Sequence, residues 1–202
     1  MTTYEALAFI KTIDPLRITV SGDIGSGKST FTTHLAEALD LPRISIGDFM
    51  REEAIARGIT LTELGAEQEK NDELDRKMDA KQHERSQEVN RGIFEGRTSW
   101  HFVVDPKIRV FLAVDPLEGA KRVLADSTNP KREHFETLEE VKAANERRKQ
   151  SEITRYQTYY HIDIFDPKNF DVFINTTPLS VHEVFEKTVV SIANYLKKPL
   201  SS

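Results

Sequence analysis

One glycine-rich stretch restricts the fold of this chain more than any other feature. Residues 22–29 read GDIGSGKS, which fits the pattern G-x-x-x-x-G-K-[ST]. A β-branched run over 17–22 precedes it and a helical pattern over 28–40 follows it, so a strand should lead through this loop into a helix. The glycines permit positive φ angles that turn amide groups inward, next to the positive end of the helix. The stretch therefore predicts an anion-binding loop within an α/β sheet.

Strand and helix patterns alternate along the rest of the chain. We expect strands at 17–22, 42–48, 92–96, 107–114 and 170–177, and helices at 28–40, 116–125, 137–160 and 181–197. Ser180 and Glu183 have the spacing of a capping box for the last helix. Such alternation predicts an α/β, three-layer P-loop NTPase fold with a five-stranded parallel sheet.

Two polar, mostly helical stretches, 49–90 and 120–160, interrupt this alternation as inserts on one domain spanning 1–202. Within the first, Leu74, Met78 and Val89 form only a thin apolar stripe, which predicts a peripheral helix with one weakly docked face. Residues 1–14 are expected to add a small helix. We find no internal repeat and no linker between independent domains.

The composition indicates which cellular compartment and which classes of binding partner to expect. The 202 residues include no cysteine, which excludes disulfides and thiolate zinc sites and fits a reducing, cytoplasmic interior. The net charge of −5 disfavours broad nucleic-acid binding, and no apolar run is long enough for a membrane span or a secretory signal. The histidines show no metal-ligand spacing: His34, His83, His101, His134, His161 and His182. We expect a monomer with no membrane and no nucleic-acid partner.

The loop predicts a nucleoside triphosphate ligand, most simply ATP with Mg²⁺. Lys28 would place a point charge on the β- and γ-phosphates, and the Ser29 hydroxyl would ligate the metal. The alternative is a glycine-rich turn that binds nothing, but the strand before it and the helix after it favour binding. The expected ATP-binding residues are Gly22, Asp23, Ile24, Gly25, Ser26, Gly27, Lys28, Ser29 and Thr30.

The residues beyond the loop favour a phosphotransferase over other P-loop proteins. There is no N-K-x-D guanine motif, and the third strand ends in FEGR rather than in the D-E of helicase-type ATPases. A small kinase that binds two polyanions needs arginines outside the loop. Arg51 follows the second strand, and Glu95 and Arg97 follow the third, at the sheet edge where α/β sites form.

A second set of charges lies within the long helical stretch over 137–160. Arg148, Glu152 and Arg155 are spaced i, i+4 and i+7, which places them on one helix face. A solvated face joined by ion pairs is the alternative reading of that spacing.

Four motifs in order resemble those of cytidylate kinase, most closely its short, archaeal-type form. They are ITVSGDIGSGKST, ISIGDFMRE, FEGR, and RRKQSEITRYQTYYHIDIFD followed by FDVFINTT, and the likeness covers roughly residues 16 to 195. The resemblance implies a nucleoside-monophosphate kinase fold with core segments 16–48, 91–125 and 165–198. It also implies a monophosphate-binding insert over 49–90 and a helical lid region over 126–160. The implied reaction transfers the γ-phosphate of ATP to CMP or dCMP, giving CDP or dCDP.

The resemblance also assigns expected roles to single residues. It implies catalytic roles for Lys28, Arg97, Arg148 and Arg155, and acceptor-binding roles for Asp48, Arg51, Glu95, Arg97, Glu152 and Arg155. Thr98 departs from the pattern, because longer bacterial enzymes have a base-reading Asp there. The insert is also short, since only 40 residues separate Arg51 from Gly92. The base and sugar preference therefore stays open.

Other interpretations stay open alongside this one. Another small P-loop kinase would act on AMP, UMP or a non-nucleotide such as shikimate, and a non-catalytic ATP-gated binding module would need no acceptor arginines. Trp100 and Phe102 either line the acceptor pocket or pack in the core or lid. The basic stretch NPKREH at 129–134 either covers phosphates or is a solvated loop.

Overall fold

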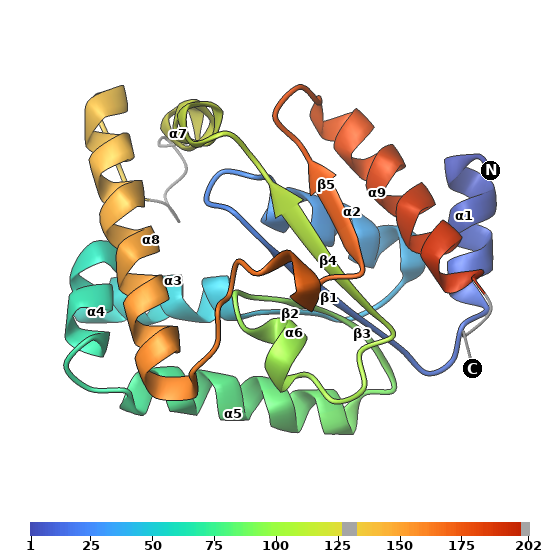
Figure 1. Ribbon diagram of the computed structural model, residues 1–202, viewed down its shortest axis with the longest axis horizontal. Coiled ribbons are helices and arrows are strands. Elements are labelled where there is room, and N and C mark those ends of the chain that lie inside the picture. Colours follow the sequence, from blue (N-terminus) through green and yellow to red (C-terminus); the bar gives the residue numbers. More distant parts are fainter. Residues whose placement is uncertain (127–132, 199–202) are drawn as a thin grey trace.

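The computed structural model describes residues 1–126 and 133–198, and within them five parallel strands form one sheet (Figure 1). The strand order is β2-β3-β1-β4-β5. The strands are β1 Leu16–Gly22, β2 Arg43–Ser45, β3 Arg91–Glu95, β4 Ile108–Ala113 and β5 Val172–Asn175. Residues 127–132, which belong to the predicted lid region and to the basic stretch at 129–134, lie outside the described residues. The predicted five-stranded parallel α/β fold is confirmed.

Helices connect the strands and cover both faces of the sheet. They are α1 Thr3–Lys11, α2 Lys28–Leu39, α3 Ile46–Arg57, α4 Leu61–Gln68, α5 Glu73–Glu88, α6 Ser99–Phe102, α7 Pro116–Ala125, α8 Leu138–Tyr160 and α9 Val181–Leu196, with a 3₁₀ turn at Pro167–Asn169. The predicted capping box of α9 is present, because Ser180 accepts a hydrogen bond from the Glu183 N–H. Within the described residues, no helix combines the length and apolar character that crossing a membrane requires.

The second strand is shorter than the sequence predicts. It ends at Ser45, whose hydroxyl accepts a hydrogen bond from the Asp48 N–H at 3.2 Å and so caps α3. Residues 46–48, predicted as strand, are therefore the first turn of a helix. This correction places Asp48 and Arg51 on α3, one turn apart, directly beyond the carboxyl end of the sheet.

The face of the sheet covered by α1, α2 and α9 holds the main apolar core. Alternate residues of β1, namely Leu16, Ile18 and Val20, are fully buried there with Leu35 of α2 and Ile192 of α9. The helices pack on the sheet and on one another, and α1 lies along α9 (Figure 1). The predicted N-terminal helix thus belongs to this layer.

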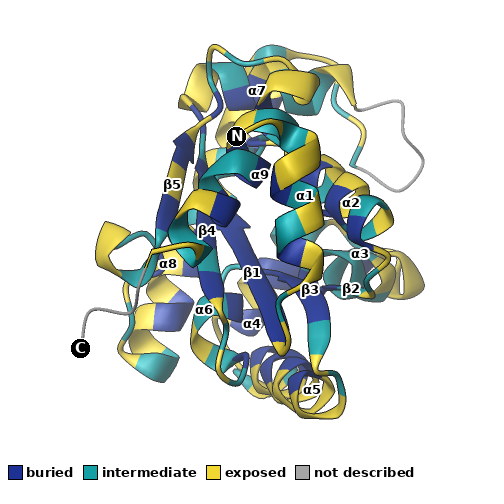
Figure 2. Cartoon of the chain, turned by 90° about the vertical axis from the view of Figure 1, so that its right-hand side faces the viewer, coloured by how far each residue is buried: buried dark blue, intermediate teal, exposed yellow. Residues whose placement is uncertain are grey.

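The α5 helix differs from its predicted character. The sequence suggested a weakly docked helix with Leu74, Met78 and Val89 on its apolar stripe, but Leu74 and Val89 are only partly buried. The buried face instead carries the polar residues Asp75, Asp79, Gln82 and Ser86, with Met78 beside them. Figure 2 shows this buried side of α5 and its exposed outer side. One docked face with a mostly exposed remainder is confirmed, but the apolar character predicted for that face was wrong, because hydrogen-bond partners outside α5 allow polar side chains to be buried there.

Candidate active site

The glycine loop lies at the carboxyl end of β1 and leads directly into α2. Gly25 has a φ of 77°, and a Cβ atom there would lie 2.3 Å from the Gly119 carbonyl oxygen, so only glycine fits. Gly27, with a φ of 85°, occupies the N-cap of α2 and supplies no capping side chain. The first amide groups of α2 are thus left to bind an anion, as the motif predicts.

Lys28 is the charged group of this loop. Its Nζ donates to the carbonyl oxygens of Gly22 at 2.8 Å and Asp23 at 2.6 Å. Burial, with a further contribution from the positive charge of Arg97, lowers the pKa of Lys28 well below its ordinary value. An anion beside Lys28 would offset both effects, which suits this position to a polyphosphate.

Ser29 and Glu95 meet at the end of the loop. The Ser29 hydroxyl donates to Glu95 Oε1 at 2.9 Å, and the Thr32 hydroxyl donates to Glu95 Oε2 at 2.7 Å. One hydroxyl and one carboxylate beside a phosphate site are the oxygen donors that Mg²⁺ uses when substrate phosphates and waters complete its shell. The residues present therefore fit a Mg²⁺ ion, although the described residues contain no cluster of three or more His, Cys, Asp or Glu that would hold a metal alone.

Arg43, which the sequence analysis did not identify, joins Glu95 to α3. Its guanidinium pairs with Glu95 Oε2 and with Asp48 Oδ2, the latter at 2.6 Å. Asp48 in turn pairs with Arg51. Burial would raise the pKa of Asp48, but its bonds to Arg51 and Arg43 outweigh burial and lower it. Asp48 does not line the cavity and instead holds Arg51, which does.

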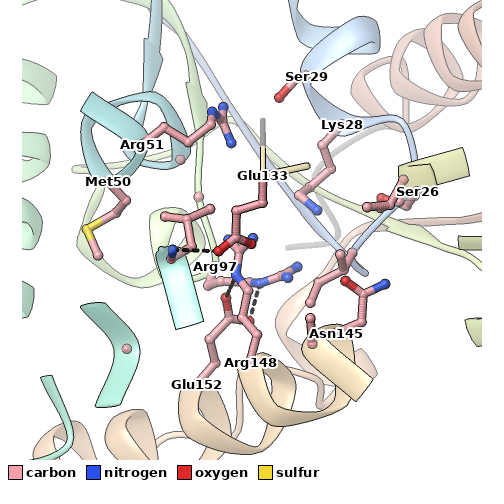
Figure 3. A pocket seen from close by; sticks show the side chains of 18 of the residues that line it. Ser26, Lys28, Ser29, Met50, Arg51, Arg97, Glu133, Asn145, Arg148 and Glu152 are labelled. Atoms are coloured by element: carbon pink, nitrogen blue, oxygen red, sulfur yellow. Dashed lines mark hydrogen bonds and ion pairs between the residues drawn. The ribbon is translucent and has the colours of Figure 1, made fainter. Parts of the chain in front are cut away.

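Arg97, Arg148 and Glu152 form a second charged group (Figure 3). Glu152 Oε2 accepts from Arg97 Nε at 2.6 Å, and Oε1 accepts from Arg148 Nε at 3.2 Å. Burial would raise the pKa of Glu152, but Arg97 and Arg148 outweigh burial and lower it. The alternative of a solvated helix face is excluded for Glu152, because only 4% of this residue is exposed.

Arg155 is separated from the other two residues of its predicted set. Its Nη1 contacts both carboxylate oxygens of Asp75 on α5, and Asp75 Oδ1 also accepts from Gln68 Nε2 at 2.8 Å. Burial raises the pKa of Asp75, although Arg155 opposes that shift. Arg155 still lines the cavity beside Glu152. Nothing in the sequence marked Asp75, because its partner lies 80 residues away.

Thr98 is also buried and belongs to the polar contacts around α5. Its hydroxyl donates to Asp79 Oδ1 at 2.8 Å, and the Tyr160 hydroxyl donates to Asp79 Oδ2 at 2.8 Å. Burial raises the pKa of Asp79 to about 6, although both hydrogen bonds oppose the shift. The Asp79 carboxylate thus lies directly against Thr98. Thr98 itself occupies the position at which the longer bacterial enzymes have an aspartate.

Trp100 and Phe102 pack against other aromatic rings. Trp100 makes an edge contact with Phe170 at 6.1 Å between centroids, and Phe102 makes one with Tyr160 at 5.0 Å. Neither residue lines the main cavity. Of the two interpretations left open by the sequence, packing is the one the structure supports.

One cavity of about 850 Å³ brings the loop and the arginines together. In Figure 3, Lys28 and Ser29 approach it from one side, and Arg51, Arg97 and Arg148 approach it from others. Glu133 also lines the cavity, and its Oε1 accepts a hydrogen bond from the Leu61 N–H of α4 at 2.8 Å. All the predicted loop residues from Ile24 to Thr30 line the cavity, whereas Gly22 and Asp23 lie behind it.

A P-loop at the carboxyl end of a five-stranded parallel sheet, with arginines facing it, defines a small P-loop phosphotransferase. The sequence profile of the cytidylate kinase-like family matches residues 17–178. The chain belongs to this family, as the resemblance implied.

Relatives with curated names agree with this membership. The cytidylate kinase of Natronomonas pharaonis is 36% identical over 87% of this chain and 90% of its own length. That of Archaeoglobus fulgidus is 33% identical over 85% of this chain and 91% of its own. Among solved structures, a shikimate kinase from Acinetobacter baumannii in complex with shikimate has a TM-score of 0.54 at 18% identity, covering 96% of this chain and 99% of its own. That similarity supports the fold alone.

Proposed function

We propose that this protein transfers the γ-phosphate of ATP to CMP or dCMP, giving ADP and CDP or dCDP. One observation carries the proposal: a single cavity has the P-loop on one wall and Arg51, Arg97, Arg148 and Arg155 on the others. Membership of the cytidylate kinase-like family supports the acceptor class. In the reaction an oxygen of the acceptor phosphate attacks the γ-phosphorus, and the bond from that phosphorus to the β,γ-bridging oxygen breaks to release ADP.

The donor would occupy the loop side of the cavity. The amides at the start of α2 would surround the β-phosphate, and Lys28 would move from the carbonyl oxygens of Gly22 and Asp23 to the γ-phosphate. Ser29 and Glu95 would hold a Mg²⁺ ion, which would neutralise charge on the donor phosphates. Arg122, which lines the cavity, donates to the Thr176 carbonyl at 2.9 Å and so fixes the loop before α9 on the donor side.

The acceptor would lie against α3, α4 and α8. Arg51, Arg97 and Arg155 would hold its phosphate in line with the donor. Glu152, which is ionised at neutral pH because its pKa is lowered, would keep Arg97 and Arg148 aimed into the cavity. In this proposal residues 49–90 form the monophosphate-binding insert and 126–160 the lid region, on a core of 16–48, 91–125 and 165–198. No strong general base is needed, because the attacking phosphate oxygen is already anionic.

We further propose that the protein acts as a monomer in the cytoplasm. The absence of cysteine fits a reducing compartment, and one chain supplies all the cavity residues named above. Light scattering on the purified protein tests the first part, and a mass of twice 23.1 kDa would contradict it.

Release of ADP from Mg-ATP tests the reaction directly. The acceptors are CMP, dCMP, UMP, AMP, GMP, shikimate and none. We expect CMP or dCMP to raise ADP release far above the blank. A preference for another monophosphate would leave the proposed site residues unchanged but would show that the acceptor carries a base other than cytosine. Release that no acceptor increases would contradict the kinase proposal and favour the ATP-gated module.

A further inference from the structure

A second cavity, of about 500 Å³, lies at the opposite end of the sheet from the P-loop. Its lining includes the basic residues Arg17, His101, Lys107 and Arg109, together with Trp100 and one carboxylate, that of Asp105, which is exposed. Arg17 is the second residue of β1, and the P-loop begins at Gly22, the last residue of that strand. At about 3.3 Å per residue, the two cavities are separated by roughly 15–20 Å of strand. The reaction proposed above uses none of these residues.

The sheet register brings the cations of this cavity together on one face. Ile18 and Ile108 are register partners buried in the apolar core, so their neighbours along the strands project from the opposite face. Arg109 is the register partner of Thr19, which places it diagonally beside Arg17 on that face. The Lys107 N–H donates to the Arg17 carbonyl at 2.9 Å, so Lys107 enters β4 level with Arg17.

Arg17, Lys107 and Arg109 form no ion pair with any residue that the structure describes, although Asp105 lines the same cavity. In those residues no carboxylate lies within 4.0 Å of the charged nitrogens of Arg17, Lys107 or Arg109. The Asp171 carboxylate accepts instead from the Arg109 backbone N–H at 2.8 Å and from the Tyr195 hydroxyl at 2.7 Å. Like charges on adjacent strands repel one another, so this arrangement carries an electrostatic cost within the chain. A bound anion would remove the repulsion.

Donors without partners lie in the same place. Arg17 Nε donates a hydrogen bond to the Val89 carbonyl at 3.0 Å, but no described group accepts one from the two terminal nitrogens of Arg17. Neither Arg109 Nε nor Trp100 Nε1 has a hydrogen-bond partner, although both atoms are buried. Buried donors in folded proteins are normally satisfied, so two orphans beside unpaired guanidinium groups indicate a missing acceptor.

We propose that this cavity binds the phosphate group of a small metabolite, or free phosphate. Arginine side chains match the oxygens of a phosphate, and three cations around one cavity suit a dianion better than a single carboxylate. The chain is acidic overall, with a net charge of −5, and the cations gather in one hollow rather than along a stripe, which disfavours a nucleic-acid backbone.

Trp100 provides a direct test, because it is the only tryptophan of the chain. Its indole N–H gives one identifiable resonance in a ¹⁵N–¹H spectrum. Titration of the full chain with potassium phosphate, against KCl at equal ionic strength, should shift that resonance saturably. Glucose 6-phosphate in a parallel titration distinguishes the two sources: tighter binding than phosphate indicates an ester, and weaker binding indicates free phosphate.

Variants connect the shift to the proposed residues. Arg109→Gln should weaken binding by about tenfold, in line with the loss of one charge-assisted contact. Lys107→Gln should also weaken phosphate binding. Because Lys107 is exposed, this variant should fold, and it provides the test if Arg109→Gln does not fold. Lys187→Gln removes one exposed charge from α9 and should have no effect.

The P-loop must be excluded as the source of the shift. Lys28→Ala should leave the Trp100 titration unchanged, because its phosphate site is separate. A shift that KCl reproduces, that survives both Lys107→Gln and Arg109→Gln, or that disappears in Lys28→Ala would overturn the proposal. None of these outcomes depends on which acceptor the kinase reaction uses.

Discussion

The helices α2 and α5 are buried through opposite kinds of contact. The α2 helix buries Phe31, Leu35 and Leu39 against β1 and α9, in an almost wholly apolar layer. The α5 helix packs against α3, α4 and α6 and buries Asp75 and Asp79 with Gln82 and Ser86, each in contact with a polar partner outside α5. Figure 2 shows both helices with a buried side turned inward, although the chemistry of those sides differs.

The difference separates the contacts that support the proposed donor side from those that support the proposed acceptor side. Apolar contact is non-directional, so on its apolar face α2 needs mainly matching volume and pattern, with Ser29 and Thr32 adding hydrogen bonds to Glu95. Polar contact is directional, and a buried group without its partner is costly. The arginines beside the acceptor region are therefore held by particular carboxylates: Arg51 by Asp48, Arg97 by Glu152 and Arg155 by Asp75. The predictions below test this contrast.

The largest effect should come from Lys28→Ala, on the apolar side. Loss of the charge on the transferring phosphate should lower kcat by about 10³-fold or more. The urea midpoint should stay at the wild-type value or rise, because Lys28 is a desolvated cation outside the apolar core. ADP release and urea unfolding measure the two quantities, with Lys187→Ala as the exposed control. Near-wild-type turnover would remove the basis of the P-loop assignment.

Arg155→Ala should have the next largest effect, which we expect on the free energy of unfolding. It leaves Asp75 buried without its ion-pair partner, which should lower the free energy of unfolding by about 3–5 kcal/mol. Leu35→Ala on the apolar side should cost about 2–5 kcal/mol through a cavity. Urea unfolding of both variants measures the two losses in free energy of unfolding.

A double variant tells the two mechanisms apart. Asp75→Leu with Arg155→Met replaces both members of the pair by apolar groups and should recover much of the loss. If the double variant is as unstable as Arg155→Ala, polar contacts other than this ion pair hold α5, and the contrast between α2 and α5 would be wrong.

Arg97→Ala tests the acceptor role without a large change in fold. We expect KM for the monophosphate to rise by about 10²-fold and KM for ATP to change little. Glu152 would keep Arg148 as a partner, so the protein should stay folded. Arg85→Ala, an exposed position on α5, is the control. A fall in ATP affinity without an effect on the acceptor would place Arg97 on the donor side instead.

Asp79→Asn should give the smallest effect, and one that depends on pH. Burial raises the pKa of Asp79 to about 6 in the folded protein, above its unfolded value of about 3.9. The folded state thus binds this proton more tightly, so the free energy of unfolding falls as the pH rises from about 4 to about 6 and stays low above that. Asparagine avoids that penalty and can still meet the Thr98 and Tyr160 hydroxyls. The variant should be more stable than wild type by about 2 kcal/mol at pH 8.

The stability difference should shrink as the pH falls from about 6 to about 4, because wild-type Asp79 becomes protonated in both states. Urea unfolding across this range measures it, with Asp40→Asn removing an exposed carboxyl as control. A variant less stable than wild type at pH 8 would mean that the ionised carboxylate is needed to satisfy its two hydroxyl donors.

Local features of the fold could be predicted from the sequence. The strand over 17–22, the helix from Lys28 and the capping box at Ser180 each depend on residues close together in the chain, and all three are confirmed. The second strand was predicted too long because the hydrophobic run continues through Ile46, and only the Ser45 cap shows where the helix begins. Motif spacing also led to the arginines, since Arg51, Arg97, Arg148 and Arg155 all line one cavity.

The sequence by itself determined the P-loop, the α/β alternation and the family, because each is written in short segments whose residues act through nearby backbone. Only the tertiary structure decided that Arg155 pairs with Asp75, that Arg43 joins Glu95 to Asp48, and that the polar side of α5 faces inward. Those contacts join residues up to 80 positions apart. A charged residue has the same local pattern whether it meets solvent or a distant partner, so periodicity alone could not distinguish the two.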